Sequence, residues 1–379
     1  MTNTSLRRWS WIHKWSSLVC TTFMLLLCLT GLPLIFHHEI QELTGTAVPA
    51  RPHPPGAQRA SLDTVLATAQ ARHPGLFPMY VSREEDDDSF WYVSLAPRLE
   101  ETEKFEVLAI DAYTAQVLPS PDFYSGFMYW MTRLHVDLFA GLPGMLFLGA
   151  MGLLLLAALV SGVVLYAPFM GKLPFGAVRR GRSARLRWLD LHNALGICTL
   201  TWLFVVGATG VVNTLAQPAL NYWQEHHLKP WLSRHAGGRP PTAAERSPLD
   251  AAVRAAMATE PGMTLSYLAF PGVLAGTPMH YTIYMRGSSA LTAKLYQPVL
   301  VNARSGAVEG SVAAPWYLKT LYLSQPLHFG DYAGMPLKLL WAVLDVLCIA
   351  VLGSGLYLWL RKPAMRPAAI AAAARKTAA

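Results

Sequence analysis

Histidines at two repeated pairs of positions are the residues whose type and spacing are best suited to chemistry. His13 recurs as His192 at an offset of 179 residues, and His135 recurs as His328 at an offset of 193. A neutral imidazole nitrogen binds transition metals, and haem iron takes two such donors on opposite faces of its macrocycle. The two pairs predict two haem b groups, one held by His13 with His192 and one by His135 with His328.

The same offsets extend beyond the histidines. Trp9-x-x-x-His13 recurs as Trp188-x-x-x-His192, and short motifs of a small hydroxyl residue followed by glycine recur as well. These are Thr30-Gly31 with Thr209-Gly210, and Ser161-Gly162 with Ser354-Gly355. We therefore interpret the chain as two copies of helix, outer segment and helix. The glycines serve either close helix packing or the approach of a flat macrocycle.

Long apolar stretches must position these residues. Hydrophobic residues make up 53% of the 379 positions and charged residues only 14%, against about 25% in soluble domains, which argues against disorder and against an ordinary soluble enzyme. Four stretches are long enough to cross a bilayer, namely 16–36, 144–168, 194–215 and 337–360. The first is too long for the apolar part of a signal peptide, which is the alternative interpretation.

Charge indicates how these stretches are oriented. Segments 1–15, 170–187 and 361–379 contain 14 Lys and Arg residues and no Asp or Glu, so the overall charge of +8 leaves −6 for the remainder. Because basic flanks stay in the cytoplasm, both termini are expected there. His13 and His192 then lie at the cytoplasmic boundary, and His135 and His328 at the outer one. The basic charge is thus a topology signal, and no nucleic-acid partner is expected.

The two long outer segments are each predicted to be a small α+β unit. Helices are expected over 61–72 and 247–259, strands over 90–95, 105–110, 279–285 and 293–301, and turns at 111–115 and 302–306. The expected fold is an integral membrane protein with an all-α four-helix core, two small α+β periplasmic domains and an internal duplication. Its expected segments are 1–15 (cytoplasmic N-terminus), 16–36 (span), 37–128 (outer domain), 129–168 (lead-in helix and span), 169–187 (basic loop), 188–215 (span), 216–325 (outer domain), 326–360 (span) and 361–379 (cytoplasmic tail).

Other polar residues compete with these histidines or would support them. His37 and His38 lie near the outer end of the first span and are alternative ligands at the outer site. Asp137 and Asp331 are close to His135 and His328 in sequence and would orient their imidazoles as hydrogen-bond acceptors. Asp345 is an acid deep within a span, with a role as a third such partner, a proton carrier or a buried polar clasp.

The chain resembles the family of PepSY-associated transmembrane proteins over residues 5–362. The resemblance rests on Trp9-x-x-x-His13 through Thr30-Gly31, on the copies of these motifs, and on the outer segments ending at 111–117 and 302–308. Within that family it is most similar to ferrioxamine-type inner-membrane ferric-siderophore reductases. That resemblance implies a place in the bacterial inner membrane and reduction of siderophore-bound Fe(III) to Fe(II) in the periplasm, with a hydroxamate siderophore as substrate. By position it assigns the haem ligands to His13, His192, His135 and His328.

The electron donor is expected to be a separate molecule. The sequence contains neither a G-x-G-x-x-G dinucleotide motif nor a P-loop, so membrane quinol or a cytoplasmic flavoprotein would supply electrons. Two other functions fit the same segments: a haem-free sensor or regulatory binding protein, and a siderophore transporter. The four cysteines form no C-x-x-C motif and are expected to be buried thiols.

Overall fold

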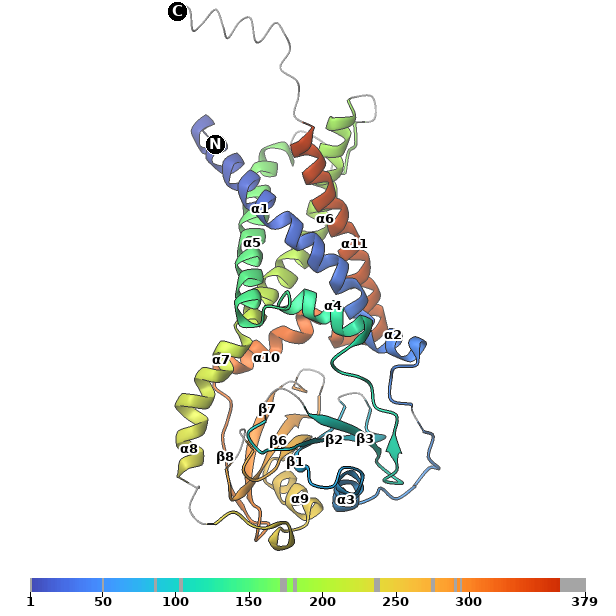
Figure 1. The fold of residues 1–379 in the computed structure, drawn as a ribbon. Helices are drawn as coiled ribbons and strands as arrows, with labels where there is room; N and C mark the ends of the chain where they lie inside the picture. The colour runs from blue at the N-terminus through green and yellow to red at the C-terminus, as the bar shows by residue number, and fades with distance from the viewer. Residues whose placement is uncertain are drawn as a thin grey trace, which may run out of the picture. The chain divides into compact units, whose positions relative to one another are not determined.

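The chain divides into two compact units (Figure 1). A computed structural model describes residues 2–49, 51–84, 87–101, 105–170, 176–179, 183–234, 239–273, 277–289, 292–293 and 295–361, without the side chains of 169, 170 and 331. The helical unit comprises Met1–Ile35, Met131–Thr214 and Met335–Ala379, and the sheet unit comprises Phe36–Trp130 and Leu215–Gly334. Most of the predicted tail 361–379 and part of the predicted basic loop 169–187 lie outside the described residues.

Within the described ranges, four helices are long and apolar enough to cross a membrane. They are α1 (Asn3–Ile35), α5 (Leu142–Met170), α6 (Ala184–Thr214) and α11 (Gly334–Leu360). A helix rises 1.5 Å per residue, so each exceeds the roughly 30 Å of a bilayer core. The prediction of four spans in a multi-pass membrane protein is confirmed at this level. The helices begin or end several residues beyond the predicted apolar stretches, because their polar ends are helical too.

Small and sulfur-containing side chains pack the interior of the helical unit. Cys20 and Met24 of α1 and Cys348 of α11 are buried in one cluster, in which Trp202 of α6 also lies. All four cysteines are free thiols, and the Sγ atoms of Cys28 and Cys348 are 3.7 Å apart. Cys20 and Cys348 are buried as expected, whereas Cys28 is half-buried and Cys198 is exposed.

Short helices carry the two histidines that precede spans. His135 lies on α4 (Gly126–Val136) and His328 on α10 (Trp316–Phe329). After α4 the backbone adopts positive φ at Leu138, Phe139 and Gly141, so α5 starts as a separate helix. After α10 the left-handed Gly330 (φ 81°) ends the helix in the same way.

The sheet unit contains one eight-stranded antiparallel sheet among the described residues, in the order β4-β3-β2-β1-β5-β6-β7-β8. The strands are β1 (Phe77–Ser82), β2 (Phe90–Ala96), β3 (Glu106–Asp111), β4 (Val117–Leu118), β5 (Met263–Ala269), β6 (His280–Gly287), β7 (Tyr296–Asn302) and β8 (Val308–Ser311). The prediction of two separate α+β domains is wrong in this respect. Val81 of β1 pairs with Leu268 of β5, so the two segments share one sheet.

Short helices complete the sheet unit. They are α2 (His37–Thr44), α3 (Leu62–Arg72), α7 (Ala216–Trp223), a π-helical turn (Gln224–Leu228), α8 (Lys229–Ser233), α9 (Leu249–Thr259) and two 3₁₀ turns (Ala243–Glu245 and Asp331–Ala333). The helices predicted over 61–72 and 247–259 correspond to α3 and α9. The predicted strands correspond to β2, β3, β6 and β7, whereas the sequence reading missed β1, β4, β5 and β8.

Helices α3 and α9 cap each other's N-termini. The Asp63 carboxylate accepts a hydrogen bond from the backbone N–H of Leu249 (2.9 Å), and Asp250 accepts one from that of Leu62 (3.0 Å). The first N–H groups of a helix have no partner within it, and negative charge is favourable at that end. The exchange therefore ties the two predicted domains together at their helices as well as at their strands.

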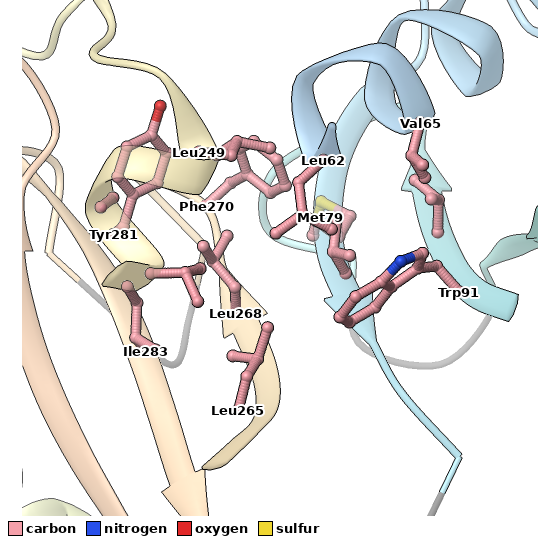
Figure 2. Packing of buried hydrophobic residues seen from close by; sticks show 14 of the residues in the cluster. Leu62, Val65, Met79, Trp91, Leu249, Leu265, Leu268, Phe270, Tyr281 and Ile283 are labelled. Atoms are coloured by element: carbon pink, nitrogen blue, oxygen red, sulfur yellow. The ribbon is translucent and has the colours of Figure 1, made fainter. Parts of the chain in front are cut away.

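One hydrophobic core extends across both segments. Leu62 and Val65 of α3 pack with Met79 of β1, and Leu249 of α9 packs in the same cluster with Leu268 of β5 (Figure 2). All five side chains are at most 5% exposed. Because the buried surface is shared, we expect the two segments to fold together.

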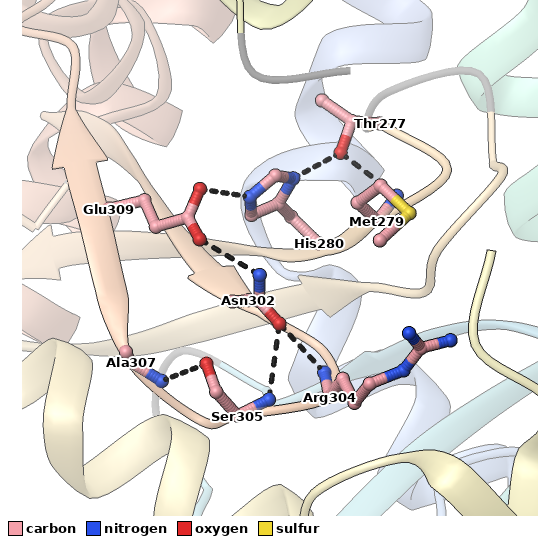
Figure 3. Close-up of polar contacts among 8 residues, drawn as sticks. All are labelled: Thr277, Met279, His280, Asn302, Arg304, Ser305, Ala307 and Glu309. Carbon is pink, nitrogen blue, oxygen red and sulfur yellow. Dashed lines mark hydrogen bonds and ion pairs between the residues drawn. The ribbon is translucent and has the colours of Figure 1, made fainter. Parts of the chain in front are cut away.

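Matching turns follow β3 and β7. The Asp111 carboxylate accepts hydrogen bonds from the N–H groups of Tyr113 and Thr114, and the Asn302 amide oxygen accepts them from Arg304 and Ser305. The Asn302 amide also donates to Glu309, whose other oxygen lies 2.7 Å from Nε2 of the buried His280 (Figure 3). The turns predicted at 111–115 and 302–306 are confirmed.

Asp111→Ala should destabilise the sheet unit by about 1–3 kcal/mol, because two turn N–H groups lose their acceptor. Burial raises the pKa of Asp111, but hydrogen bonds from Thr114 and Tyr113 and the nearby His53 outweigh it and lower the pKa overall. The advantage of the wild type is thus present at neutral pH and shrinks as the pH falls through the lowered value. Thermal unfolding of the full chain in detergent over a pH series measures it.

Asp111→Asn is the matched control, since Asn302 makes the same turn with an amide. It should retain most of the stability that Asp111→Ala loses. Equal losses in the two variants would mean that the ion pair with His53, at 3.2 Å, matters more than the turn.

Candidate functional site

His13 of α1 and His192 of α6 come together within the helical unit. Their ring centroids are 6.4 Å apart and their planes are inclined at 72°. Both rings line one cavity of about 670 Å³. The repeat predicted that these two residues form a pair.

Each of the two rings is held through Nδ1. Nδ1 of His13 lies 2.9 Å from the carbonyl oxygen of Ala158 and 3.3 Å from the Ser161 hydroxyl. Nδ1 of His192 lies 3.1 Å from the carbonyl oxygen of Val351 and 3.0 Å from the Ser354 hydroxyl. A carbonyl oxygen can only accept, so Nδ1 carries the hydrogen on both rings and Nε2 keeps its lone pair.

The serine hydroxyls support this tautomer. Ser161 Oγ donates to the carbonyl oxygen of Ala157 at 2.7 Å, and Ser354 Oγ donates to that of Val351 at 2.8 Å. Having used its hydrogen, each hydroxyl oxygen can accept one from the imidazole. The outward nitrogen Nε2 is thereby prepared as a metal donor, the usual arrangement of a ligating histidine.

A glycine next to each serine lets the ring approach the helix. A Cβ atom on Gly162 would lie 3.2 Å from Cε1 of His13, and one on Gly355 would lie 3.3 Å from Cε1 of His192. In a helix the carbonyl of residue i points toward residue i+4. Ala158 precedes Gly162 by four positions, and Val351 precedes Gly355 by four. A side chain at either glycine would therefore keep the imidazole ring away from the carbonyl oxygen that accepts its hydrogen bond. We call Ser161-Gly162 and Ser354-Gly355 the Ser-Gly seats.

Basic residues also line this cavity. Lys14, Arg179 and Arg185 belong to its wall. Arg179 forms a two-pronged ion pair with Asp190, with Nη2–Oδ1 at 2.6 Å and Nε–Oδ2 at 3.0 Å. The Asp190 side chain is buried, and Arg179 balances its charge. Lys14 and Arg185 therefore give the cavity a positive balance.

His135 occupies a comparable seat. Its Nδ1 lies 3.0 Å from the Thr30 hydroxyl, which itself donates to the carbonyl oxygen of Leu26 at 2.8 Å. A Cβ atom on Gly31 would lie 3.0 Å from Cε1 of His135. The Thr30-Gly31 motif thus does for His135 what the Ser-Gly seats do for His13 and His192.

The other predicted residues of the outer site lie in the sheet unit. His328 is on α10, and His37 and His38 begin α2 with their ring centroids 3.9 Å apart. His135 belongs to the helical unit. The pairing of His135 with His328, and the alternative of His37 or His38, remain predictions.

The predicted supporting acids differ in their surroundings. The Asp137 carboxylate is bound by Arg133 (2.8 Å) and by the backbone N–H of Phe139 (3.0 Å), and its role beside His135 stays a prediction. The side chain of Asp331 lies outside the described residues. Asp345 is 5% exposed, and its Oδ2 has no hydrogen-bond partner among the described residues.

The arrangement limits what kind of metal the pair could hold. Among the described residues, no group of three or more His, Cys, Asp or Glu side chains is placed to bind a metal ion. Protein sites for bare ions usually supply at least three such ligands. His13 and His192 are two such side chains.

Gly355→Val should destabilise the helical unit more than Gly353→Val, by about 1–3 kcal/mol. The reason is that a side chain at 355 meets the His192 ring, whereas a Cβ atom at 353 meets nothing within 4 Å. Both glycines lie on α11, so helix propensity is matched. Thermal unfolding in detergent compares the two variants. Equal melting temperatures would contradict the claim that the His192 ring packs against Gly355.

Comparison with known proteins agrees with the resemblance on which the sequence interpretation drew. An uncharacterized protein of Pseudomonas aeruginosa is 29% identical over 267 residues, which cover 62% of this chain and 64% of that protein. The chain therefore matches slightly less than two thirds of that relative. The family model described as the PepSY-associated TM region matches residues 10–362. Since this match includes both Ser-Gly seats and nearly all of the chain, the protein belongs to the family of PepSY-associated transmembrane proteins.

Proposed function

We propose that the protein is a di-haem b oxidoreductase of the bacterial inner membrane that reduces siderophore-bound Fe(III) to Fe(II) in the periplasm. The observation that carries the proposal is the geometry of His13 and His192. Two rings from different helices point to one cavity, each with Nδ1 satisfied by its seat and Nε2 left as the donor.

The distance between the rings fits a shared iron. A metal–nitrogen bond of about 2.0–2.1 Å on each side, with the radius of an imidazole ring added, places the centroids about 6.3 Å apart. The observed separation is 6.4 Å. The cavity of about 670 Å³ is also within the roughly 300–1,000 Å³ of cofactor and ligand pockets.

Residues of the chain complement the other features of haem b. The macrocycle is flat and apolar with two carboxylates, and the cavity combines apolar side chains such as Leu155 and Leu203 with Lys14 and Arg185. When bound, the haem would supply single-electron transfer. The seats would fix the plane and tautomer of each imidazole, and the hydrogen bonds at Nδ1 would raise its basicity as a ligand.

The second haem is proposed between His135 and His328. His135 has a hydroxyl-glycine seat at Thr30-Gly31, and the repeat gives His328 the corresponding motif Thr209-Gly210. His37 and His38 are the alternative ligands there. Asp345 stays a candidate for a polar partner between the two sites, since one of its carboxylate oxygens is unsatisfied by the described residues.

Substrate, donor and orientation complete the proposal. Siderophore oxygens are hard ligands that hold Fe(III) better than Fe(II), so reduction would release the metal. Quinol or a cytoplasmic flavoprotein would donate electrons at the inner face, where the positive-inside rule predicts His13 and His192. Two alternative functions are a haem-free sensor and a siderophore transporter. Absence of haem in the experiment described next would favour them.

The purified chain should show a haem b Soret band, with α and β bands in the reduced-minus-oxidised difference spectrum. His192→Ala should lose about half of the haem, because one of two iron centres loses an axial ligand. His226→Ala, a change in the sheet unit, is the control and should retain all of it. Haem quantification per chain measures the result, and a preparation with no Soret band, or an unchanged His192→Ala spectrum, would rule out the haem proposal.

Ser354→Ala should raise the midpoint potential of the inner haem by an amount on the order of tens of millivolts. Losing an acceptor at Nδ1 makes the imidazole a weaker donor to Fe(III). Ser161→Ala should have the smaller effect, because its hydroxyl is 3.3 Å from Nδ1 and the Ala158 carbonyl oxygen is closer, at 2.9 Å. Spectroelectrochemical titration distinguishes the two, and a larger shift for Ser161→Ala would contradict this order.

A further inference from the structure

The sheet unit has a cavity of its own, with a volume of about 320 Å³. It lies between one face of strands β5–β7 and helices α7 and α10. The opposite face of these strands, with Leu268, Ile283 and Val299, belongs to the core under α3 and α9. Alternation along the strands thus directs a separate set of side chains into the cavity.

Tyrosine is the most frequent residue type in the described wall of this cavity. Tyr267 of β5 is in register with Tyr284 of β6, and their rings stack with centroids 4.3 Å apart and an interplanar angle of 12°. Tyr296 of β7 meets Tyr322 of α10 edge to face at 5.3 Å. The wall therefore presents aromatic faces and edges with hydroxyl groups at their tips.

A buried hydrogen-bond donor in the same wall lacks an acceptor. Trp223 of α7 is 3% exposed, and its indole N–H has no hydrogen-bond partner among the described residues. A buried donor is normally paired, so an unpaired one that lines a cavity points to a bound acceptor. The indole is a donor only, so the missing partner must supply an oxygen or nitrogen lone pair.

The cavity carries no charge. Its described lining contains no Asp, Glu, Lys, Arg or His. Burial raises the pKa of Tyr267 well above its usual value and that of Tyr322 to about 12, so these phenols are neutral hydrogen-bond donors. The complementary ligand is a neutral group with acceptor oxygens and apolar stems.

We infer that this cavity binds one hydroxamate arm of the siderophore. An amide carbonyl oxygen of the spacer, which the metal leaves free, would accept from the Trp223 N–H or a tyrosine hydroxyl, and the methylene groups of the spacer would lie against the tyrosine rings. The volume is at the lower end of ligand pockets, which fits one arm better than a whole chelate. The inference rests on the proposed function, because that proposal supplies the hydroxamate substrate.

Binding can be separated from electron transfer with a redox-inert metal. The probe is a linear trihydroxamate loaded with Ga(III), titrated calorimetrically into the full chain in detergent. Tyr296→Phe and Trp223→Phe should each raise its Kd about fivefold to tenfold, as expected for the loss of one hydrogen bond. Ala314→Met, which fills the cavity from a buried wall position, should weaken binding at least as much.

Tyr222→Phe is the matched control. Tyr222 precedes Trp223 on α7, is 53% exposed and does not line the cavity, so its loss of a hydroxyl should leave Kd unchanged. Melting temperatures establish that each variant is folded. If Trp223→Phe fails to fold, Tyr296→Phe and Ala314→Met still decide the question. Unchanged Kd values in both, or binding of a short-chain quinone with no binding of the trihydroxamate, would overturn the assignment.

The outcome also distinguishes this inference from the proposed function. An Fe(II)-capture assay on the Fe(III)-loaded chelate, with a short-chain quinol supplied as the electron donor, gives KM and turnover. If the wild type releases Fe(II) and the cavity variants have the same KM and Kd as the wild type, the cavity assignment fails and the reductase stands. If the gallium chelate binds in the cavity but no Fe(II) is released, the reductase fails and the cavity assignment stands.

Discussion

A hydrogen bond between imidazole Nδ1 and the backbone of a neighbouring helix is the constraint around which the helical unit is arranged. A helix carbonyl already accepts from the N–H four residues later, and a second donor can reach it only where no side chain intervenes. Gly162 and Gly355 meet that requirement next to Ala158 and Val351. The adjoining serines add a second acceptor. Each histidine is thereby fixed by an element far from it in sequence.

That constraint determines how closely the helices approach. A histidine on α1 reaches the backbone of α5, and one on α6 reaches the backbone of α11, which requires small residues where the helices meet. Small residues are also what helix association in a bilayer favours, because it depends on close van der Waals packing. The same glycines therefore allow the helices to pack closely and the imidazoles to adopt their orientation. The positive-φ residues Leu138 and Phe139 allow His135 to lie on a separate helix, with its own orientation to Thr30.

Much of this could be predicted from the sequence, where the signal was local or repeated. Apolar length predicted the four long helices, the offset of 179 predicted that His13 and His192 meet, and Asp111 and Asn302 marked their turns. The hydroxyl-glycine motifs were recognised as repeats, but their role was missed because it depends on the rotation of one helix against another. Strand β1 was missed because Pro78 obscures its pattern. Its pairing with β5 has no local signal, since the partners are nearly two hundred positions apart.

The shared sheet has a consequence for biosynthesis. Strand β1 is an interior strand, yet its partner β5 is synthesised only after α5 and α6. Until then the first half of the sheet presents an unpaired edge, and its core lacks the residues from α9 and β5. An open edge with exposed apolar surface readily pairs with other chains. During synthesis the protein must therefore pass through a stage in which its first sheet segment is vulnerable to aggregation, and completion of the third long helix is the step that brings its partner within reach.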